Sequence, residues 1–266
     1  MCKIYAISNQ KGGVGKTTLS LNLGTSLAKM GKKVCLIDCD PQANMSMALG
    51  CQQPDELPIT MPDIIKEIIK LNFDEKTSEL LQNREYILRS QGVDFIPSSI
   101  ELANVENVLL NTMSRENVLK KLVNHIKDNY DYILLDTMPS LNFVTINALN
   151  AADSVLIPVQ PQFFSTKGLE LLFATIGNVK RNLNPKLEIE SALVTMYDSR
   201  IIFHREVVRI IEETYAGYFK VFATKIPVSI RATESQARSM SIFEHDPAGK
   251  IAENYELFAR ELLGEV

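Results

Sequence analysis

The sequence predicts an α/β fold built on a mostly parallel, doubly wound sheet with helices on both faces. Two patterns support this prediction. Short runs of β-branched and apolar residues alternate with amphipathic runs along nearly all of the 266-residue chain, as expected when strands and helices follow one another in a parallel sheet. A glycine-rich segment also separates the first apolar run from the first amphipathic run, which is the strand–loop–helix order of a phosphate-binding loop.

Each expected strand is a short, nearly continuous apolar run, because strands of such a sheet are buried on both faces. In chain order the expected strands are Lys3–Ser8, Lys33–Ile37, Val93–Ile96, Tyr132–Asp136, Ser154–Pro158, Ile189–Met196 and Val221–Ile226. The expected helices have apolar residues at helical spacing. They are Thr17–Met30, Arg115–Lys127, Thr166–Leu183, Phe203–Tyr215 and Pro247–Leu263. Gly31 follows the first helix at a position where glycine is common.

The segment at residues 50–89 is the least regular part of the chain. We expect it to be an insertion packed on the same domain, so that residues 1–266 form one domain of ordinary length. The segment contains the prolines Pro54, Pro58 and Pro62. Two short helical patterns follow, at Asp63–Leu71 and Lys76–Gln82.

Composition narrows the functional classes. The net charge of −4 provides no global basic field, so any nucleic-acid binding needs a local patch. The four cysteines, Cys2, Cys35, Cys39 and Cys51, have no CxxC spacing, which indicates reduced thiols in a cytosolic protein. No run of about 18 apolar residues is present, and the glycine-rich segment interrupts the first apolar run, so we expect neither a membrane span nor a secretory signal.

The strongest functional signal is the segment Lys11–Thr18, whose sequence is KGGVGKTT. Its glycines allow consecutive amide groups to point into one concavity, and such a nest at a helix N-terminus binds phosphate. Lys16 adds a charge for the β- and γ-phosphates, and the Thr17 hydroxyl can ligate Mg²⁺. The segment departs from the general pattern in two ways: Gln10 occupies the first glycine position, and Lys11 adds a second lysine.

Acidic residues end two of the expected strands. Asp38 and Asp40 close the second strand, and Pro41 directs the chain out of it. In open α/β sheets ligands bind outside the carboxyl ends of the strands, so both acids should reach toward the phosphate loop. Asp136 ends a later apolar strand and fits the Walker B pattern, in which the acid holds Mg²⁺.

These segments resemble the deviant Walker A loop and the two following signatures of the ParA/MinD ATPase superfamily. The three signatures are Lys11–Thr18, Asp38–Gln42 and Ile133–Ser140. Further segments are similar to the ParA/Soj branch more narrowly, and they are Ile96–Ala103, Ile157–Gln162, Val194–Arg200 and Lys225–Pro227. The resemblance covers nearly the whole chain. It implies an ATP-dependent DNA-partition ATPase with weak basal turnover.

The resemblance also implies roles for individual residues. The phosphates of ATP or ADP are cradled by the amides of Gly12, Gly13, Val14, Gly15, Lys16 and Thr17, with Thr18 near the α-phosphate. Lys11 and Lys16 act in catalysis, Lys16 in its own subunit and Lys11 across an ATP-dependent homodimer. Asp40 orients the attacking water, and Asp38 supports it or the Mg²⁺ shell. Mg²⁺ is held by Thr17 and Asp136, and the base lies near Met196 and Pro227.

Members of the branch bind double-stranded DNA without sequence preference and are released by hydrolysis that a ParB-like centromere-binding partner stimulates. This implies a cytoplasmic, nucleoid-associated protein. Binding to phosphates needs clustered Lys or Arg, and the candidates are Arg200, Arg205, Arg209, Arg231 and Arg238. The chain starts at its first strand, so we expect no helix-turn-helix extension and no operator binding. Two positions depart from the branch: Met138 stands where proline is common, and Val228 where arginine is common. The nucleotide- or DNA-facing contact of that arginine is therefore not carried over to this chain.

Three alternatives use the same fold. A MinD-like membrane-cycling ATPase needs a basic amphipathic C-terminal helix, but Tyr255–Val266 is net acidic and reads as a core-packing helix. An iron–sulfur carrier needs paired cysteine ligands, and no cysteine follows Cys51. A scaffold that binds ATP without hydrolysis is disfavoured because both lysines and both acids are present.

Overall fold

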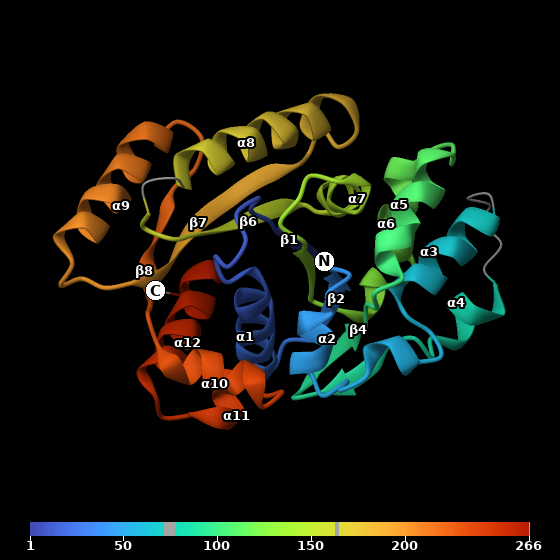
Figure 1. Ribbon diagram of the computed structural model, residues 1–266, viewed down its shortest axis with the longest axis horizontal. Coiled ribbons are helices and arrows are strands. Elements are labelled where there is room, and N and C mark those ends of the chain that lie inside the picture. The colour runs from blue at the N-terminus through green and yellow to red at the C-terminus, as the bar shows by residue number, and fades with distance from the viewer. Residues whose placement is uncertain (72–77, 163–164, 266) are drawn as a thin grey trace.

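The computed structural model of the chain describes residues 1–71, 78–162 and 165–265. Its strands form one sheet in the order β3-β4-β2-β5-β1-β6-β7-β8 (Figure 1). All neighbours pair in parallel except β3 and β4, which are antiparallel. The strands are β1 (Lys3–Ile7), β2 (Val34–Cys39), β3 (Leu88–Ser90), β4 (Val93–Ile96), β5 (Tyr132–Thr137), β6 (Ser154–Val159), β7 (Glu188–Tyr197) and β8 (Val221–Pro227). The predicted fold class is confirmed.

Helices cover both faces of the sheet (Figure 1). One face carries α3 (Met61–Lys70), α4 (Glu79–Asn83), α5 (Leu102–Leu110), α6 (Val118–Ile126), α7 (Phe143–Ala151), α8 (Ser165–Asn182) and α9 (Ile202–Tyr215). The other face carries α1 (Lys16–Lys29), α2 (Asn44–Ala48), α10 (Ile230–Ala237), α11 (Ile242–His245) and α12 (Lys250–Leu262). Short 3₁₀ turns lie at Pro54–Glu56, Arg115–Asn117 and Lys127–Asn129.

The central strands read as continuous apolar runs because each contributes to two cores. In β1, Ile4 and Ala6 enter the core beneath α3 to α9, whereas Tyr5 and Ile7 enter the core beneath α1 and α12. Successive strand side chains point to opposite faces, so a strand covered on both sides needs an apolar residue at every position.

The described helices of the irregular segment at residues 50–89, α3 and α4, pack on the first of these cores. Helix α3 begins at Met61, two residues before the predicted start, because Thr60 and Asp63 form a capping box. The Thr60 amide donates to Asp63 Oδ2 at 2.9 Å, and Ile64, Ile65 and Ile68 are buried in the core. The first two residues of the predicted helix Lys76–Gln82 lie outside the described residues, and α4 spans Glu79–Asn83.

Several elements were missed by periodicity. Strand β3 is a three-residue hairpin arm with one apolar residue, and α2, α10 and α11 are too short or too polar to show a pattern. Helix α5 was not predicted, although its buried Leu102, Val105 and Leu109 stand at helical spacing. Helix α7 is buried on nearly every side, so its apolar residues do not repeat at helical spacing. The last predicted helix starts at Lys250 instead of Pro247, because a turn closed by Gly249 N donating to Asp246 O at 3.0 Å precedes it.

Candidate phosphate-binding site

The carboxyl ends of β1, β2 and β5 meet at one edge of the sheet. Asp136 of β5 lies beside Ile7 of β1 on one side and beside Asp38 of β2 on the other. Parallel strands end at the same edge, so the loop that follows β1 opens next to both acids. The structure therefore brings together the glycine-rich loop and the two strand-ending acids.

The loop curls because Gly13 and Gly15 adopt left-handed backbone conformations, with φ of 73° and 86°. A residue with a side chain adopts this conformation only at a cost. Helix α1 then begins at Lys16 without a side-chain cap. The first amides of a helix have no acceptor within the helix, so here they are available to an anion held in the loop.

The Lys16 side chain is only 7% exposed. Within the described residues, its Nζ donates one long hydrogen bond, 3.3 Å to Lys11 O. Burial lowers the pKa of Lys16, while the carboxylates of Asp136 and Asp40 oppose this shift. An ammonium group has three donors, and burying it with so few acceptors is costly. A phosphate in the loop would supply the missing acceptors.

Asp136 is buried and only half satisfied. Its Oδ1 accepts a 2.9 Å hydrogen bond from Ser20 Oγ of α1, whereas Oδ2 is buried with no partner among the described residues. Burial, and next the charge of Asp38, raises the pKa of Asp136 to about 7. An unpaired carboxylate oxygen is a ligand that Mg²⁺ prefers, and the half-buried Thr17 stands in the first turn of α1. These residues fit a magnesium site.

Asp38 organises the backbone around Asp40. Its fully buried carboxylate accepts hydrogen bonds from Ser46 N (2.9 Å), Ser46 Oγ (2.7 Å) and Asp40 N (3.2 Å). Burial raises the pKa of Asp38 to about 6, against the lowering effect of these three bonds. Ser46 Oγ in turn accepts from Ser98 N at 3.0 Å. Asp38 therefore holds Asp40 through the main chain, and the half-buried Asp40 side chain stays at the mouth of the site.

Three polar residues that sequence reasoning missed brace the loop from neighbouring strands. Thr195 Oγ1 at the end of β7 donates to Val14 O at 2.8 Å, and Gln160 Nε2 after β6 donates to Gly13 O at 2.7 Å. Asn9 Nδ2 donates to Pro158 O at 2.8 Å, and Asn9 Oδ1 accepts from Lys11 N at 3.0 Å. For Asn9 and Gln160 the available signal was a polar residue just after a buried strand, whereas Thr195 lies within β7 and carried no such signal.

Lys11 differs from Lys16 in its surroundings. Its side chain is partly exposed, and its Nζ donates to Gln162 Oε1 in the segment after β6. Its amide, in contrast, is bonded within the loop. The two lysines of the loop therefore lie in different environments, one buried beside the acids and one toward the solvent.

The predicted base contacts lie at the neighbouring strand ends. Pro227 of β8 is aligned with Tyr197 of β7, and Met196 precedes it with a left-handed φ of 52°. Gln160 Nε2, which braces the loop, also contacts Met196 Sδ at 2.6 Å. Pro227 lines an open groove of about 1130 Å³ between the loops that follow β7 and β8.

The five predicted DNA-contacting arginines are only partly clustered. Arg200 and Arg231 line the groove beside Pro227, but they pair with Asp198 (2.8 Å) and Glu234 (3.0 Å) respectively. Hydrogen bonds from the Arg200 side chain and backbone lower the pKa of Asp198 to about 2. The remaining arginines are Arg205, which donates to Ser199 O at 2.6 Å, Arg209, which pairs with Glu213 at 3.7 Å, and Arg238, which is exposed after the last turn of α10.

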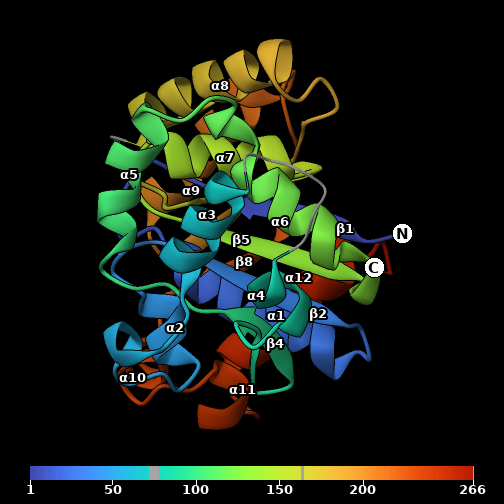
Figure 2. The ribbon, with the colours of Figure 1, turned by 90° about the vertical axis from the view of Figure 1, so that its right-hand side faces the viewer.

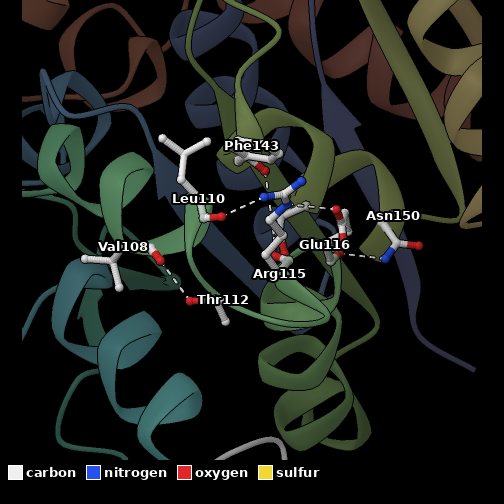
Figure 3. A network of polar contacts seen from close by, with 8 residues as sticks. Val108, Leu110, Thr112, Arg115, Glu116, Phe143 and Asn150 are labelled. Carbon is white, nitrogen blue, oxygen red and sulfur yellow. Dashed lines mark hydrogen bonds and ion pairs between the residues drawn. The ribbon is translucent and has the colours of Figure 1, made fainter.

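The 3₁₀ turn Arg115–Asn117 is anchored on helix α7 (Figure 3). The Arg115 guanidinium lies over the Phe143 ring at 4.4 Å and donates to Leu110 O at 2.8 Å. From α7, the buried amides of Asn147 and Asn150 donate to Arg115 O and Glu116 O, each at 2.7 Å. These contacts fix the turn that precedes α6 against the first turns of α7.

The features that would support the alternative functions are accounted for within the fold. The apolar face of α12, formed by Ile251, Tyr255 and Phe258, is buried against α1 and β8. Cys35 and Cys39 are buried in β2, and no group of three or more His, Cys, Asp or Glu suited to a metal occurs in the described part of the chain. No described helix has both the length and the apolar character needed to cross a bilayer.

Comparisons with known proteins agree with this geometry. A family model described as an AAA domain matches residues 2–189. The sporulation initiation inhibitor protein Soj of Bacillus subtilis is 39% identical over 262 residues, 98% of each chain. The chromosome partitioning protein ParA of Myxococcus xanthus is 39% identical over 263 residues, 98% of this chain and 88% of that one. The structure of cobyrinic acid a,c-diamide synthase from Mycobacterium smegmatis with bound ADP and magnesium matches with a TM-score of 0.82 and 30% identity, over 99% of this chain and 94% of that one.

Proposed function

The chain belongs to the AAA domain family and, within it, to the ParA/Soj partitioning ATPases, and from this premise we propose that it is a Mg²⁺-dependent ATPase with weak basal turnover that cycles on and off DNA. ATP binding drives homodimerisation, and the dimer binds double-stranded DNA without sequence preference. A ParB-like partner stimulates ATP hydrolysis, and hydrolysis releases the protein from DNA. The protein is therefore associated with the nucleoid only in its ATP-bound state.

One observation carries the ATPase proposal: within the described residues, two buried groups of opposite charge beside the same sheet edge have fewer hydrogen-bond partners than they can use. They are the Lys16 ammonium, with one long hydrogen bond, and the unpaired Asp136 Oδ2. A nucleotide phosphate satisfies the first, and a magnesium ion shared with Thr17 satisfies the second. Mg²⁺, when bound, neutralises negative charge that develops on the phosphates.

In this proposal the residues of the chain divide the work. Lys16 and the loop amides bind and orient the triphosphate. Asp40 accepts a hydrogen bond from the attacking water and aligns it with the γ-phosphate, while Asp38 holds the Asp40 backbone. The position of Lys11, toward the solvent and away from the acids, supports its action on the nucleotide of a second subunit.

Two substitutions test the ATPase. Lys16→Ala should abolish ATP binding, because it removes the phosphate charge. Asp40→Ala should retain binding and lose hydrolysis, because water alignment matters only in the transition state. Lys66→Ala, on the exposed side of α3, is the matched lysine control. ATP hydrolysis by Asp40→Ala at the rate of the unmodified protein would remove that residue from the reaction.

Anisotropy on unrelated duplexes, with ATP and with ADP, tests the DNA cycle. We expect tight DNA binding with ATP but not with ADP. The logarithm of the DNA affinity should fall linearly with the logarithm of the salt concentration. Arg231→Ala and Arg209→Ala should weaken binding on every sequence and reduce the salt slope by roughly 1 per lost phosphate contact. Arg89→Ala, on β3 at the opposite edge of the sheet, is the control. Equal affinity in both nucleotide states would contradict the cycle.

A further inference from the structure

Helix α10 contacts the phosphate-loop helix through one polar side chain. Gln236 Nε2 donates a 2.6 Å hydrogen bond to Thr18 Oγ1, and both side chains are half-buried. Thr18 lies in the first turn of α1, two residues after Lys16. The contact therefore joins the mouth of the phosphate loop to a helix more than two hundred residues away in the sequence.

The chemistry of the hydroxyl makes this contact sensitive to a bound anion. A threonine hydroxyl has one proton to donate and two lone pairs that accept. Because Gln236 donates to one lone pair, the Thr18 proton is free to donate to a phosphate oxygen in front of the helix. A hydrogen bond to a charged phosphate polarises the hydroxyl, which strengthens the bond that it accepts from Gln236.

Helix α10 buries little of its own surface, so one hydrogen bond is a substantial share of its attachment. Ser235 is the only one of its residues that is fully buried. Beyond its end, Gln91 Nε2 donates to Ser239 O (3.3 Å) and to Ala48 O (2.9 Å). Both views show α10 beside α2, which follows the Asp38–Asp40 segment (Figures 1 and 2). Elements with few buried apolar contacts open at low free-energy cost.

We propose that Gln236 is a positioning residue that couples occupancy of the phosphate site to the docking of α10. Nucleotide binding tightens the Thr18–Gln236 bond and holds α10 against α1, and the docked helix in turn stabilises the bound nucleotide, because such coupling is reciprocal. Helix α10 carries Arg231 at the groove, so its docking also sets the place of that arginine. The inference rests on the proposed nucleotide binding.

Hydrogen–deuterium exchange with ADP and Mg²⁺ tests the coupling, and ADP avoids the ATP-driven dimer. In the unmodified protein, ADP should slow exchange of the α10 amides several-fold. Gln236→Leu keeps the size of the side chain and removes the donor, so ADP should no longer slow α10, and ADP affinity should fall about three- to tenfold. The matched control is Gln52→Leu, whose amide donates to Ser239 Oγ at 2.8 Å near the same helix without contacting the loop.

Thr18 provides a second, independent set of variants. Thr18→Ser keeps the hydroxyl and should retain the ADP-dependent slowing, whereas Thr18→Val should lose it. The double variant Thr18→Val/Gln236→Leu should bind ADP no more weakly than Thr18→Val alone, because both changes remove the same contact. Full slowing of α10 in Gln236→Leu, or additive losses in the double variant, would overturn the inference. Anisotropy with a fluorescent ADP separates failure of the proposed function from failure of the coupling. Absence of ADP binding contradicts the proposed function, whereas ADP binding without slower amide exchange in α10 contradicts only the coupling.

Discussion

Replacing Ser46 with alanine tests how the structure holds the segment that carries Asp40. Ser46 Oγ is fully buried, donates to Asp38 Oδ2 at 2.7 Å and accepts from Ser98 N at 3.0 Å. Alanine removes both bonds at once. The Asp38 carboxylate keeps two backbone donors, but the Ser98 amide loses its acceptor in the interior.

The expected loss follows from these two bonds. A hydrogen bond to a charged group contributes about 1.5–3 kcal/mol, and an unsatisfied buried donor costs about 1–3 kcal/mol. Since the two effects overlap at one side chain, we expect Ser46→Ala to lower the free energy of unfolding by about 3 kcal/mol. Urea denaturation followed by circular dichroism measures this loss. Ser26→Ala is the matched control, because Ser26 Oγ is buried without a hydrogen-bond partner among the described residues, and we expect no loss of stability there.

The loss should also depend on pH, with a defined sign. Burial raises the pKa of Asp38 to about 6 in the folded protein, above its unfolded value, so folding takes up a proton and Asp38 contributes more stability as pH falls through about 6. Ser46 Oγ stabilises the ionised form more than the protonated form. The difference between Ser46→Ala and the unmodified protein should therefore be larger near pH 8 than near pH 5. A loss that is equal at both pH values, or no larger than that of Ser26→Ala, would refute this account of Asp38.

Three further predictions concern other parts of the molecule. Glu261→Ala should lower the melting temperature and promote aggregation, because the Glu261 carboxylate accepts hydrogen bonds from Ala223 N (2.6 Å) and Thr224 N (2.9 Å) where the register of edge strand β8 shifts. Differential scanning calorimetry and light scattering measure the two effects, and Glu256→Ala on the same helix is the control. Arg115→Ala should destabilise the protein by about 1–3 kcal/mol in urea, through loss of the Phe143 and Leu110 contacts, and an unchanged midpoint would contradict the anchoring in Figure 3. Lys11→Ala in the Asp40→Ala background should stay monomeric with ATP in light scattering, whereas an undiminished dimer would remove Lys11 from the subunit interface.

Helix α12 and the loop at Lys11–Thr18 show why much of this protein could be predicted from its sequence. The apolar spacing in Tyr255–Val266 predicted a core-packing helix, and the face of α12 formed by Ile251, Tyr255 and Phe258 is buried. The glycines and Lys16 predicted a phosphate loop, because the backbone conformation and the charge that such a loop needs are encoded within eight adjacent residues. The order of the strand-ending acids then placed them at one edge, since parallel strands end together.

Contacts between distant segments were decided only by the tertiary structure. Sequence spacing says nothing about Gln236 reaching Thr18, Thr195 bracing Val14 or Ser46 holding Asp38, because each pair joins segments that only sheet order and helix packing bring together. The pairing of Arg200 and Arg231 with acids, which reduces the positive charge of the groove, was hidden for the same reason. Functional groups that depend on neighbouring residues can be predicted from their order along the chain. The distant residues that bond to these groups are determined by the tertiary structure.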